Sequence, residues 1–394
     1  MKRILIVENG AGFGGALTSL ASLLERLDPA RFEVHLFSSY PQKIITAGGA
    51  VRRVGVWERK RLYGLGSRLE LALRPIFRQR AGNASFLADH LSTGRMFAKK
   101  TAAYARVNHI DLIQGNNGIL INDAVILGAA RAKLPCVIHA RSGEYPGRVG
   151  AWLAARVARV LAVSNYVADT VRKLGVLGER IALAPEGLDA PRFAKSADAQ
   201  AFRTRYGLSD DCPVIGMVAC LVGWKGHEVF LRACADVLPR FNAKSVIVGG
   251  EPDGSGRYLA KLRTMARDLG LGERVVFTGH EPDVAQALAA CQVVVHASTS
   301  PEPFGRVLLE AMAVGRPVVA ARAGGAAEVV EHGRDGLLVA PGNVGELARA
   351  MRLLLEDAPL RTSLGRAGRE KVGRYSIENH AARVEAVWDA LTAR

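Results

Sequence analysis

Short β-rich runs alternate with amphipathic runs of helical length along nearly the whole chain, and this alternation restricts the fold more than any other feature. It is typical of parallel sheets wrapped by helices. The strand candidates of the first half are residues 3–7, 32–38, 111–114, 135–139, 159–163 and 180–184. Those of the second half are residues 213–219, 244–248, 274–278, 292–296, 317–320 and 336–339. We therefore predict an α/β protein with two doubly wound, Rossmann-like domains.

The chain length of 394 residues agrees with two domains, and the polar stretch 189–211 is the natural junction between them. We predict a first domain over residues 1–190 and a second over 191–375. A final helix follows over 376–394, where Ser376 is a plausible N-cap. An apolar stripe at Val384, Val387 and Leu391 predicts that this helix docks on a domain.

Several classes of protein are excluded by what the sequence contains. Its cysteines are odd in number and form no Cys-x-x-Cys pair, which argues against a disulfide framework or a structural zinc site. The apolar run before Glu8 has only four residues, too few for a signal peptide, and no uncharged stretch approaches a membrane span. We expect a cytoplasmic protein that is soluble or peripheral at the inner face of the membrane. The cysteines are Cys136, Cys212, Cys220, Cys234 and Cys291.

The net charge of +16 is concentrated in the first domain. Residues 1–190 hold 27 Lys and Arg against 14 Asp and Glu, and residues 51–110 alone hold 13 against 3. Apolar and basic residues alternate there at helical spacing. This pattern fits either a basic amphipathic helix on an anionic membrane or a core-facing helix with a solvated face. The sequence has no zinc-finger spacing and no RNA-recognition motif, so we expect no nucleic-acid partner. The apolar positions are Leu62, Leu65, Leu69, Leu73 and Phe77, and the basic ones are Arg61, Arg68, Arg74 and Arg78.

A glycine-rich loop follows the first predicted strand, with Gly10, Gly12, Gly14 and Gly15. Such a loop lets backbone amides approach a phosphate or a hydroxyl-rich ligand. A dinucleotide site also needs an acid at the end of the second strand, where Ser38 stands instead. A ligand-binding loop, a purely structural turn and, less favourably, a dinucleotide site remain the interpretations.

Lys225 lies in a Lys-Gly-His run just after the first strand of the second domain. A lysine at such a strand-to-helix turn is suited to hold a phosphate. Alone, it would equally fit a solvated turn lysine. His139 ends a strand of the first domain, where a ligand-binding histidine would lie, although a lone histidine is more often structural.

Two carboxylates flank a Pro-Phe-Gly loop and an apolar helix in the second domain, at Glu302 and Glu310. A carboxylate in an apolar helix needs a partner, and the vicinal diol of a ribose can donate two hydrogen bonds to it. The amides at the helix start suit a diphosphate. Gly324 and Gly325 open the next strand-to-helix turn and could also let backbone approach a ligand.

These motifs together resemble the retaining glycosyltransferases of family 4. The resemblance rests on Lys225-Gly-His, on the Glu302-x7-Glu310 pair, and on Gly-Arg-Pro followed by Gly324-Gly-x-x-Glu. It implies the GT-B fold, with two Rossmann-like domains facing a cleft and the last helix crossing back to the first domain. It also implies a nucleotide diphosphate sugar as co-substrate and no metal cofactor.

Carried over by residue, the resemblance implies that Lys225 binds the donor diphosphate and Glu310 the nucleotide ribose. Glu302, with Phe304 and Gly305, would lie at the transferred sugar. It further implies that Gly14 and Gly15 pack against the donor phosphates and that His139 contacts the donor sugar. Glu302, His139 and Lys225 are thus the candidate catalytic residues.

Two positions depart from the family pattern. Cys220 stands where the family commonly has an arginine, so we expect Arg306 to assist Lys225 and count it among the donor-binding residues. Glu186 stands where the family commonly has an asparagine.

The predicted activity is transfer of a sugar from a nucleotide diphosphate sugar to a hydroxyl acceptor, with retention of anomeric configuration. A lipid-linked glycan of cell-surface polysaccharide or lipopolysaccharide synthesis is the expected acceptor. A sugar-nucleotide 2-epimerase of the same fold and a catalytically weakened binding protein are the alternatives.

Overall fold

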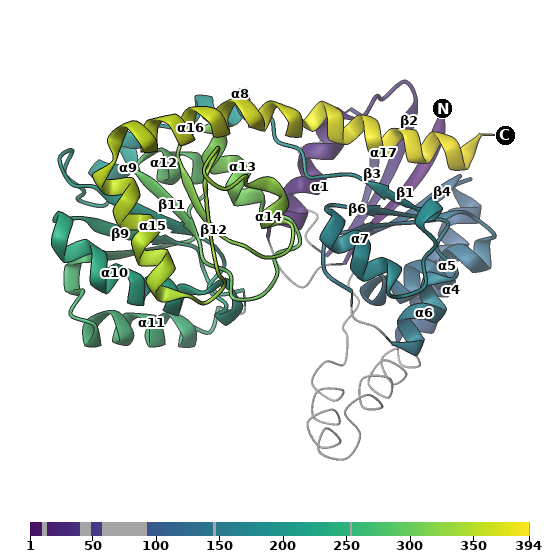
Figure 1. Ribbon diagram of the computed structural model, residues 1–394. Helices are drawn as coiled ribbons and strands as arrows, with labels where there is room; N and C mark the ends of the chain where they lie inside the picture. The colour runs from purple at the N-terminus through teal and green to yellow at the C-terminus, as the bar shows by residue number, and fades with distance from the viewer. Residues whose placement is uncertain (10–13, 40–48, 57–92, 145–146, 253, 394) are drawn as a thin grey trace, which may run out of the picture. The chain divides into compact units, whose positions relative to one another are not determined.

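The structure is a computed structural model that describes residues 1–9, 14–39, 49–56, 93–144, 147–252 and 254–393. The chain forms two compact units (Figure 1). Unit 1 comprises Met1–Gly187 and Ile377–Arg394, and unit 2 comprises Leu188–Ser376. Each contains a parallel sheet with helices, which confirms the predicted pair of Rossmann-like folds.

The sheet of unit 1 has the strand order β3-β2-β1-β4-β5-β6-β7, and all its pairs are parallel. The order reverses between β1 and β4, and in open α/β sheets ligands bind outside the carboxyl ends of strands at such a point. The strands are β1 (Lys2–Glu8), β2 (Phe32–Ser38), β3 (Val51–Val56), β4 (Leu112–Asn117), β5 (Cys136–Ala140), β6 (Arg159–Ala162) and β7 (Ile181–Leu183).

Helices cover this sheet because their apolar stripes must leave water. In α1, for example, Leu17, Leu20 and Leu24 are buried against the core. The helices are α1 (Gly15–Arg26), α4 (Arg95–Val107), η3 (Leu120–Asn122), α5 (Asp123–Ala132), α6 (Arg148–Ala154), α7 (Asn165–Arg172), η4 (Gly178–Arg180) and α17 (Ile377–Thr392).

The last helix, α17, packs against α1 and β4 of unit 1, as predicted from its apolar stripe. Trp388 is fully buried, contacts the Phe32 ring edge-on at 5.2 Å, and donates a hydrogen bond to Gln114 at 2.8 Å. Asp389 pairs with Lys2 at 2.6 Å. The C-terminal helix is therefore part of the core of unit 1.

The sheet of unit 2 has the order β10-β9-β8-β11-β12-β13, again entirely parallel, and its order reverses between β8 and β11. The carboxyl ends of these two neighbouring strands lie at one edge of the sheet. The strands are β8 (Val214–Val218), β9 (Lys244–Val248), β10 (Val275–Gly279), β11 (Val293–His296), β12 (Val318–Ala321) and β13 (Leu337–Val339).

In unit 2, α10 packs against α11 and α15, whereas α12 and α13 pack against α9 and α8. The helices are α8 (Ala190–Lys195), α9 (Ala199–Arg205), η5 (Gly223–Lys225), α10 (His227–Phe241), α11 (Arg257–Asp268), η6 (Gly272–Arg274), α12 (Val284–Ala289), α13 (Arg306–Ala313), α14 (Ala326–Val329), α15 (Val344–Glu356), α16 (Ala358–Val372) and η7 (Gly373–Tyr375).

Strand β3 was not among the predicted strands. It pairs with β2 at the end of the sheet, and its Arg52 and Arg53 are exposed. Charged side chains on an edge strand weaken the apolar alternation that marks a strand. The predicted amphipathic helix of residues 62–78 lies outside the described residues. Among the helices of the described part, none is long and apolar enough to cross a membrane.

Candidate active site

An ion pair between Lys225 and Glu302 joins the segments that follow β8 and β11 in unit 2. The Lys225 Nζ lies 2.9 Å from Oε1 and 2.8 Å from Oε2 of Glu302. Two further side chains reach the same carboxylate: His296 Nε2 at 3.2 Å and Ser298 Oγ at 3.1 Å. Because an ionised carboxylate only accepts hydrogen bonds, the His296 Nε2 carries a proton and donates a hydrogen bond to Glu302.

The surroundings keep Glu302 ionised. Burial on its own raises the pKa of Glu302, but the hydrogen bond from His296 and the positive charge of Lys225 outweigh it and lower the pKa to about 2. The residue is only 9% exposed. A fixed negative charge therefore stands beside the Lys225 ammonium at neutral pH.

Two glycines hold the Glu302 loop in place. The amide of Gly325 donates to the Glu302 carbonyl at 2.7 Å, and Gly324 forms a β-bridge with Glu302. A Cβ on Gly324 would lie 2.3 Å from the Glu302 carbonyl oxygen, and one on Gly325 would lie 2.3 Å from the Pro303 carbonyl oxygen. These glycines therefore allow two loops to pack closely. The predicted approach of their backbone to a ligand stays a prediction.

The turn that carries Lys225 is fixed against the loop after β11. Gly226 has φ +82°, and a Cβ there would lie 1.9 Å from the Ala297 carbonyl oxygen. The Thr299 amide donates to the Trp224 carbonyl at 2.8 Å. The Lys225 Nζ also lies 4.2 Å from the centre of the Trp224 ring. These contacts set the position from which Lys225 reaches Glu302.

Helix α13 begins directly after the Glu302 loop. Gly305, with φ +92°, is its N-cap, and no side chain of the described residues caps it. Phe304 is buried and contacts the Tyr375 ring edge-on at 5.8 Å. One turn into the helix, Arg306 Nε donates to Glu310 Oε1 at 2.8 Å. The role of Arg306 as a second phosphate-binding cation stays a prediction.

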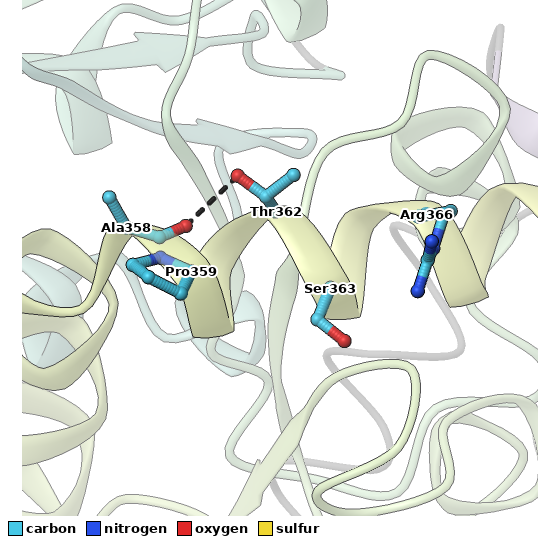
Figure 2. Close-up of a pocket in the computed structure, with 5 residues that line it drawn as sticks. All are labelled: Ala358, Pro359, Thr362, Ser363 and Arg366. Carbon is cyan, nitrogen blue, oxygen red and sulfur yellow. Dashed lines mark hydrogen bonds between the residues drawn. The ribbon is translucent and has the colours of Figure 1, made fainter.

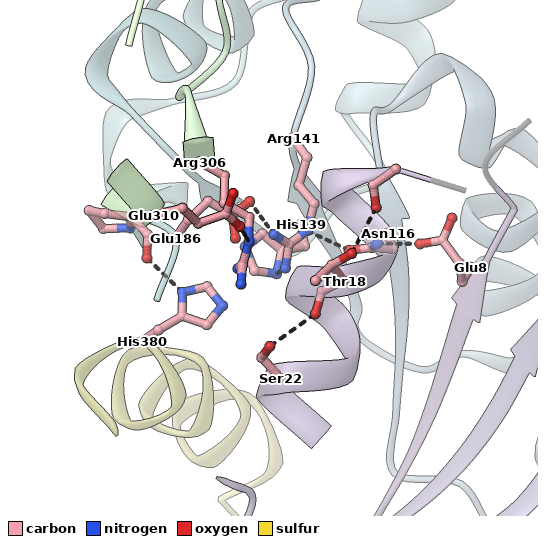
Figure 3. A network of polar contacts seen from close by, with 12 residues as sticks. Glu8, Thr18, Ser22, Asn116, His139, Arg141, Glu186, Arg306, Glu310 and His380 are labelled. Atoms are coloured by element: carbon pink, nitrogen blue, oxygen red, sulfur yellow. Dashed lines mark hydrogen bonds and ion pairs between the residues drawn. The ribbon is translucent and has the colours of Figure 1, made fainter. Parts of the chain in front are cut away.

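His139 ends β5 of unit 1 and is fully buried. Its Nδ1 lies 3.3 Å from Arg141 Nη2, and its ring stacks on His380 with 5.3 Å between ring centres. Arg141 forms an ion pair with Glu186 and donates to Asn116 Oδ1 at 2.9 Å. Figure 3 draws these side chains, which come from β4, from β5 and the residue after it, from the segment after β7 and from α17.

Gly14 and Gly15 form the start of α1 in unit 1. Gly14 is its N-cap, and the Leu17 amide donates to the Gly14 carbonyl at 3.0 Å. An added Cβ at either glycine would meet no described atom within 4 Å. Gly10 and Gly12 of the same motif lie outside the described residues. The predicted phosphate contact of this loop stays a prediction.

The structure thus brings Lys225 and Glu302 together in unit 2, close to the start of α13. His296 and Ser298, which also contact Glu302, were not among the predicted site residues. His296 ends a predicted strand, as His139 does, so the argument applied to His139 could have found it. The roles assigned to the individual site residues stay predictions.

Two further features bear on ligand binding. In the described part of the chain, no cluster of three or more His, Cys, Asp or Glu side chains could hold a metal ion. Figure 2 shows a hollow on the surface of α16, where Thr362 Oγ1 donates to the Ala358 carbonyl at 2.9 Å. All its lining residues lie on α16 and none is a predicted site residue. They are Ala358, Pro359, Thr362, Ser363 and Arg366.

Comparison with known proteins identifies both halves of the chain. The family model Glycosyltransferase Family 4 matches residues 13–192, and Glycosyl transferases group 1 matches residues 198–371. The GDP-mannose-dependent alpha-(1-6)-phosphatidylinositol monomannoside mannosyltransferase of Mycolicibacterium smegmatis is 39% identical over 197 residues, which are 47% of this chain and 50% of that protein. The D-inositol 3-phosphate glycosyltransferase of Corynebacterium jeikeium is 33% identical over 218 residues, 54% of this chain and 52% of that protein. The chain thus spans about half the length of these relatives.

A solved structure matches over nearly the full length. Anabaena HepE, crystallised with UDP and glucose, has a TM-score of 0.78 and 25% identity, with 99% of this chain and 100% of that chain covered. The match extends the likeness beyond the part shared with the sequence relatives. Together with the two family models, which each match just under half of the chain, it supports a GT4-like glycosyltransferase and shows two Rossmann-like domains with the GT-B fold.

Proposed function

We propose that the chain is a retaining, metal-independent glycosyltransferase that moves a sugar from a nucleotide diphosphate sugar to a hydroxyl acceptor. The observation that carries this proposal is the Lys225–Glu302 pair beside the start of α13. Lys225 supplies a positive charge, and the N-terminus of α13 supplies a positive helix dipole. Both suit a diphosphate, which gains negative charge as the bond to the sugar breaks.

Lys225 and Glu302 divide the work in this proposal. Donor binding brings the diphosphate to the Lys225 ammonium, which can donate three hydrogen bonds and so serve two anions. Glu302 stays ionised through its contacts with His296 and Ser298. The proposal assigns it to the transferred sugar. A negative charge there stabilises the positive charge that develops at the anomeric carbon.

Reaction without a metal follows from the same charges. Lys225 and the helix amides neutralise the leaving diphosphate, and the departing phosphate oxygen accepts the proton of the incoming hydroxyl. The bond to the leaving oxygen breaks on the face where the new bond forms, so the configuration is retained. Glu310 holds the nucleotide ribose in this arrangement.

The relatives support the class of donor and acceptor. The Mycolicibacterium smegmatis relative is named for a GDP-mannose donor and a phosphatidylinositol acceptor, and the Anabaena structure holds UDP and glucose. We therefore propose a nucleotide diphosphate hexose as donor and a lipid-linked acceptor of cell-surface glycan synthesis. The basic segment 51–110 would bring the protein to an anionic membrane surface.

The test of the activity is incubation with a panel of UDP-, GDP- and ADP-sugars, with and without a membrane lipid extract. We expect nucleoside diphosphate release that requires the extract, together with a glycosylated lipid whose anomeric configuration, read by NMR, equals that of the donor. Conversion of the donor alone to its epimer would refute transfer. An inverted product would refute the retaining mechanism.

The membrane contact has a separate test. Changing Arg59, Lys60, Arg61 and Arg68 together to Gln should reduce cosedimentation with anionic vesicles at low salt, because each cation near such a surface contributes about 1 kcal/mol. Binding of the unchanged protein should fall as salt rises. Equal cosedimentation with anionic and neutral vesicles would contradict the membrane contact.

A further inference from the structure

A buried arginine, Arg141, occupies the centre of a polar network in unit 1 that the proposed reaction does not yet use. It is 8% exposed and lies just after β5. Its Nη1 pairs with Glu186, its Nε donates to Asn116 Oδ1 at 2.9 Å, and its Nη2 lies 3.3 Å from His139 Nδ1. Asn116 in turn donates to Glu8 at the end of β1. The guanidinium is therefore held on three sides.

The contact between Arg141 and His139 fixes the proton on the histidine ring. A guanidinium has only donors, so Nδ1 of His139 must accept with its lone pair. A neutral imidazole carries one proton, which must then lie on Nε2. The ring of His139 is thus held in one of its two tautomers.

The Nε2 of His139 is buried and has no hydrogen-bond partner among the described residues. A buried N–H donor without a partner is unfavourable, and such groups commonly mark a place where a ligand or water binds. The position of His139 at the carboxyl end of β5 is where an α/β sheet places its ligands.

The charges around His139 favour the neutral ring. Burial lowers its pKa well below the ordinary value, and the positive charge of Arg141 and the neighbouring His380 lower it further. His380 comes from α17, and its Nδ1 lies 2.7 Å from the Pro185 carbonyl oxygen. Burial on its own raises the pKa of Glu186, but the positive charge of Arg141 outweighs it and lowers the pKa. The ionised Glu186 therefore neutralises the charge of Arg141.

We propose that Arg141, held by Glu186 and Asn116, is a positioning residue that keeps His139 as a neutral donor of one hydrogen bond from Nε2. In this state His139 donates a hydrogen bond to a hydroxyl oxygen of a bound sugar and does not act as a general base. The sugar contact rests on the proposed function, whereas the proton position does not. Glu186, which departs from the family pattern, thereby gains a role as the counterion of Arg141.

The test reads the proton position directly. Protein labelled with 15N-histidine is examined without any nucleotide sugar at pH 7.5, and the His139 signals are assigned by their loss in His139→Gln. We expect a protonated Nε2 and an unprotonated Nδ1. A protonated Nδ1, or an imidazolium with both nitrogens protonated, would overturn the proposal without any variant of the network.

Three variants connect the proton position to turnover. In Arg141→Leu we expect a mixture of tautomers and a fall in kcat of about tenfold, the scale of one lost hydrogen bond, with the affinity for nucleoside diphosphate unchanged. Glu186→Gln should change the tautomer ratio and kcat in the same direction but by a smaller amount. Arg172→Leu, which removes an exposed arginine of the same unit, is the matched control and should change neither.

The outcomes separate this proposal from the proposed function. A folded Arg141→Leu variant that keeps the tautomer and the kcat of the unchanged protein refutes the positioning role. The expected tautomer in a protein that transfers no sugar refutes the proposed function and leaves the proton position standing. Sugar transfer by a protein whose His139 has the other tautomer refutes the proton position and leaves the proposed function standing.

Discussion

Acidification should remove a defined part of the stability of unit 2 through Glu302. Its pKa falls from an ordinary 4.5 in the unfolded chain to about 2 in the folded protein, chiefly because His296 and Lys225 outweigh the effect of burial. Each unit of this difference corresponds to about 1.4 kcal/mol, so the ionised carboxylate contributes about 3 kcal/mol to the free energy of unfolding. The contribution is present above pH 4.5 and is lost as the pH falls toward 2.

The assay compares urea unfolding of the unchanged protein and of Glu302→Gln between pH 7 and pH 2.5. Glutamine has nearly the same shape and cannot ionise, so the difference in unfolding free energy isolates the titration of Glu302. We expect this difference to shrink by about 2 to 3 kcal/mol as the pH falls.

Glu331→Gln is the matched control. Glu331 belongs to the same unit, but its side chain is 56% exposed and pairs with Arg334 only at the surface. Such pairs contribute less than about 1 kcal/mol, so the control should show little dependence on pH. A difference between Glu302→Gln and the unchanged protein that stays constant from pH 7 to pH 2.5 would refute the reasoning.

Three further predictions address other sites. Burial raises the pKa of Glu144 to about 6, against hydrogen bonds from backbone amides, so stability falls as the pH rises from 4.5 to 6. Glu144→Gln should therefore raise the unfolding free energy by about 2 kcal/mol at pH 7.5 and leave it unchanged at pH 4. Equal effects at the two pH values would contradict this. Gly226→Ala should lower the free energy of urea unfolding by about 2 to 4 kcal/mol, because its Cβ would clash with the Ala297 carbonyl. Gly223→Ala, in the same turn, has open space and should be tolerated. Equal losses of unfolding free energy in the two variants would contradict this. Glu310→Ala should weaken UDP or GDP binding by about tenfold or more in calorimetry, because the ribose loses its carboxylate, and an unchanged affinity would remove Glu310 from the site.

Most of the sheet structure could be predicted from the sequence, because β-branched runs between turn signals mark buried parallel strands. Each predicted strand matches an observed one within three residues at either end. Strand β3 was not predicted because Arg52 and Arg53 interrupt its apolar pattern. The pairing of β3 with β2 identifies it as a strand, and this pairing is visible only in the folded sheet.

The sequence could place Lys225 and Glu302 after their strands, but it could not predict the contact between them, and their roles stay predictions. Lys225 and Glu302 each lie in the segment that follows a predicted strand, yet they are 77 positions apart. They meet because β8 and β11 are neighbours, and strand order is a property of the whole sheet. The contacts of Arg141 with Glu186 and His139 depend in the same way on packing that no local pattern records.

The most direct test of the central claim is calorimetric titration of UDP and GDP into the unchanged protein and into Lys225→Ala. The account predicts that one of the two nucleotides binds and that its dissociation constant rises by about 10 to 1000-fold in the variant, because a charged partner of the diphosphate is lost. Lys261→Ala, which removes an exposed lysine of the same unit, should bind as the unchanged protein does. Equal affinity in Lys225→Ala and in the unchanged protein would contradict the claim that Lys225 and Glu302 mark the donor site.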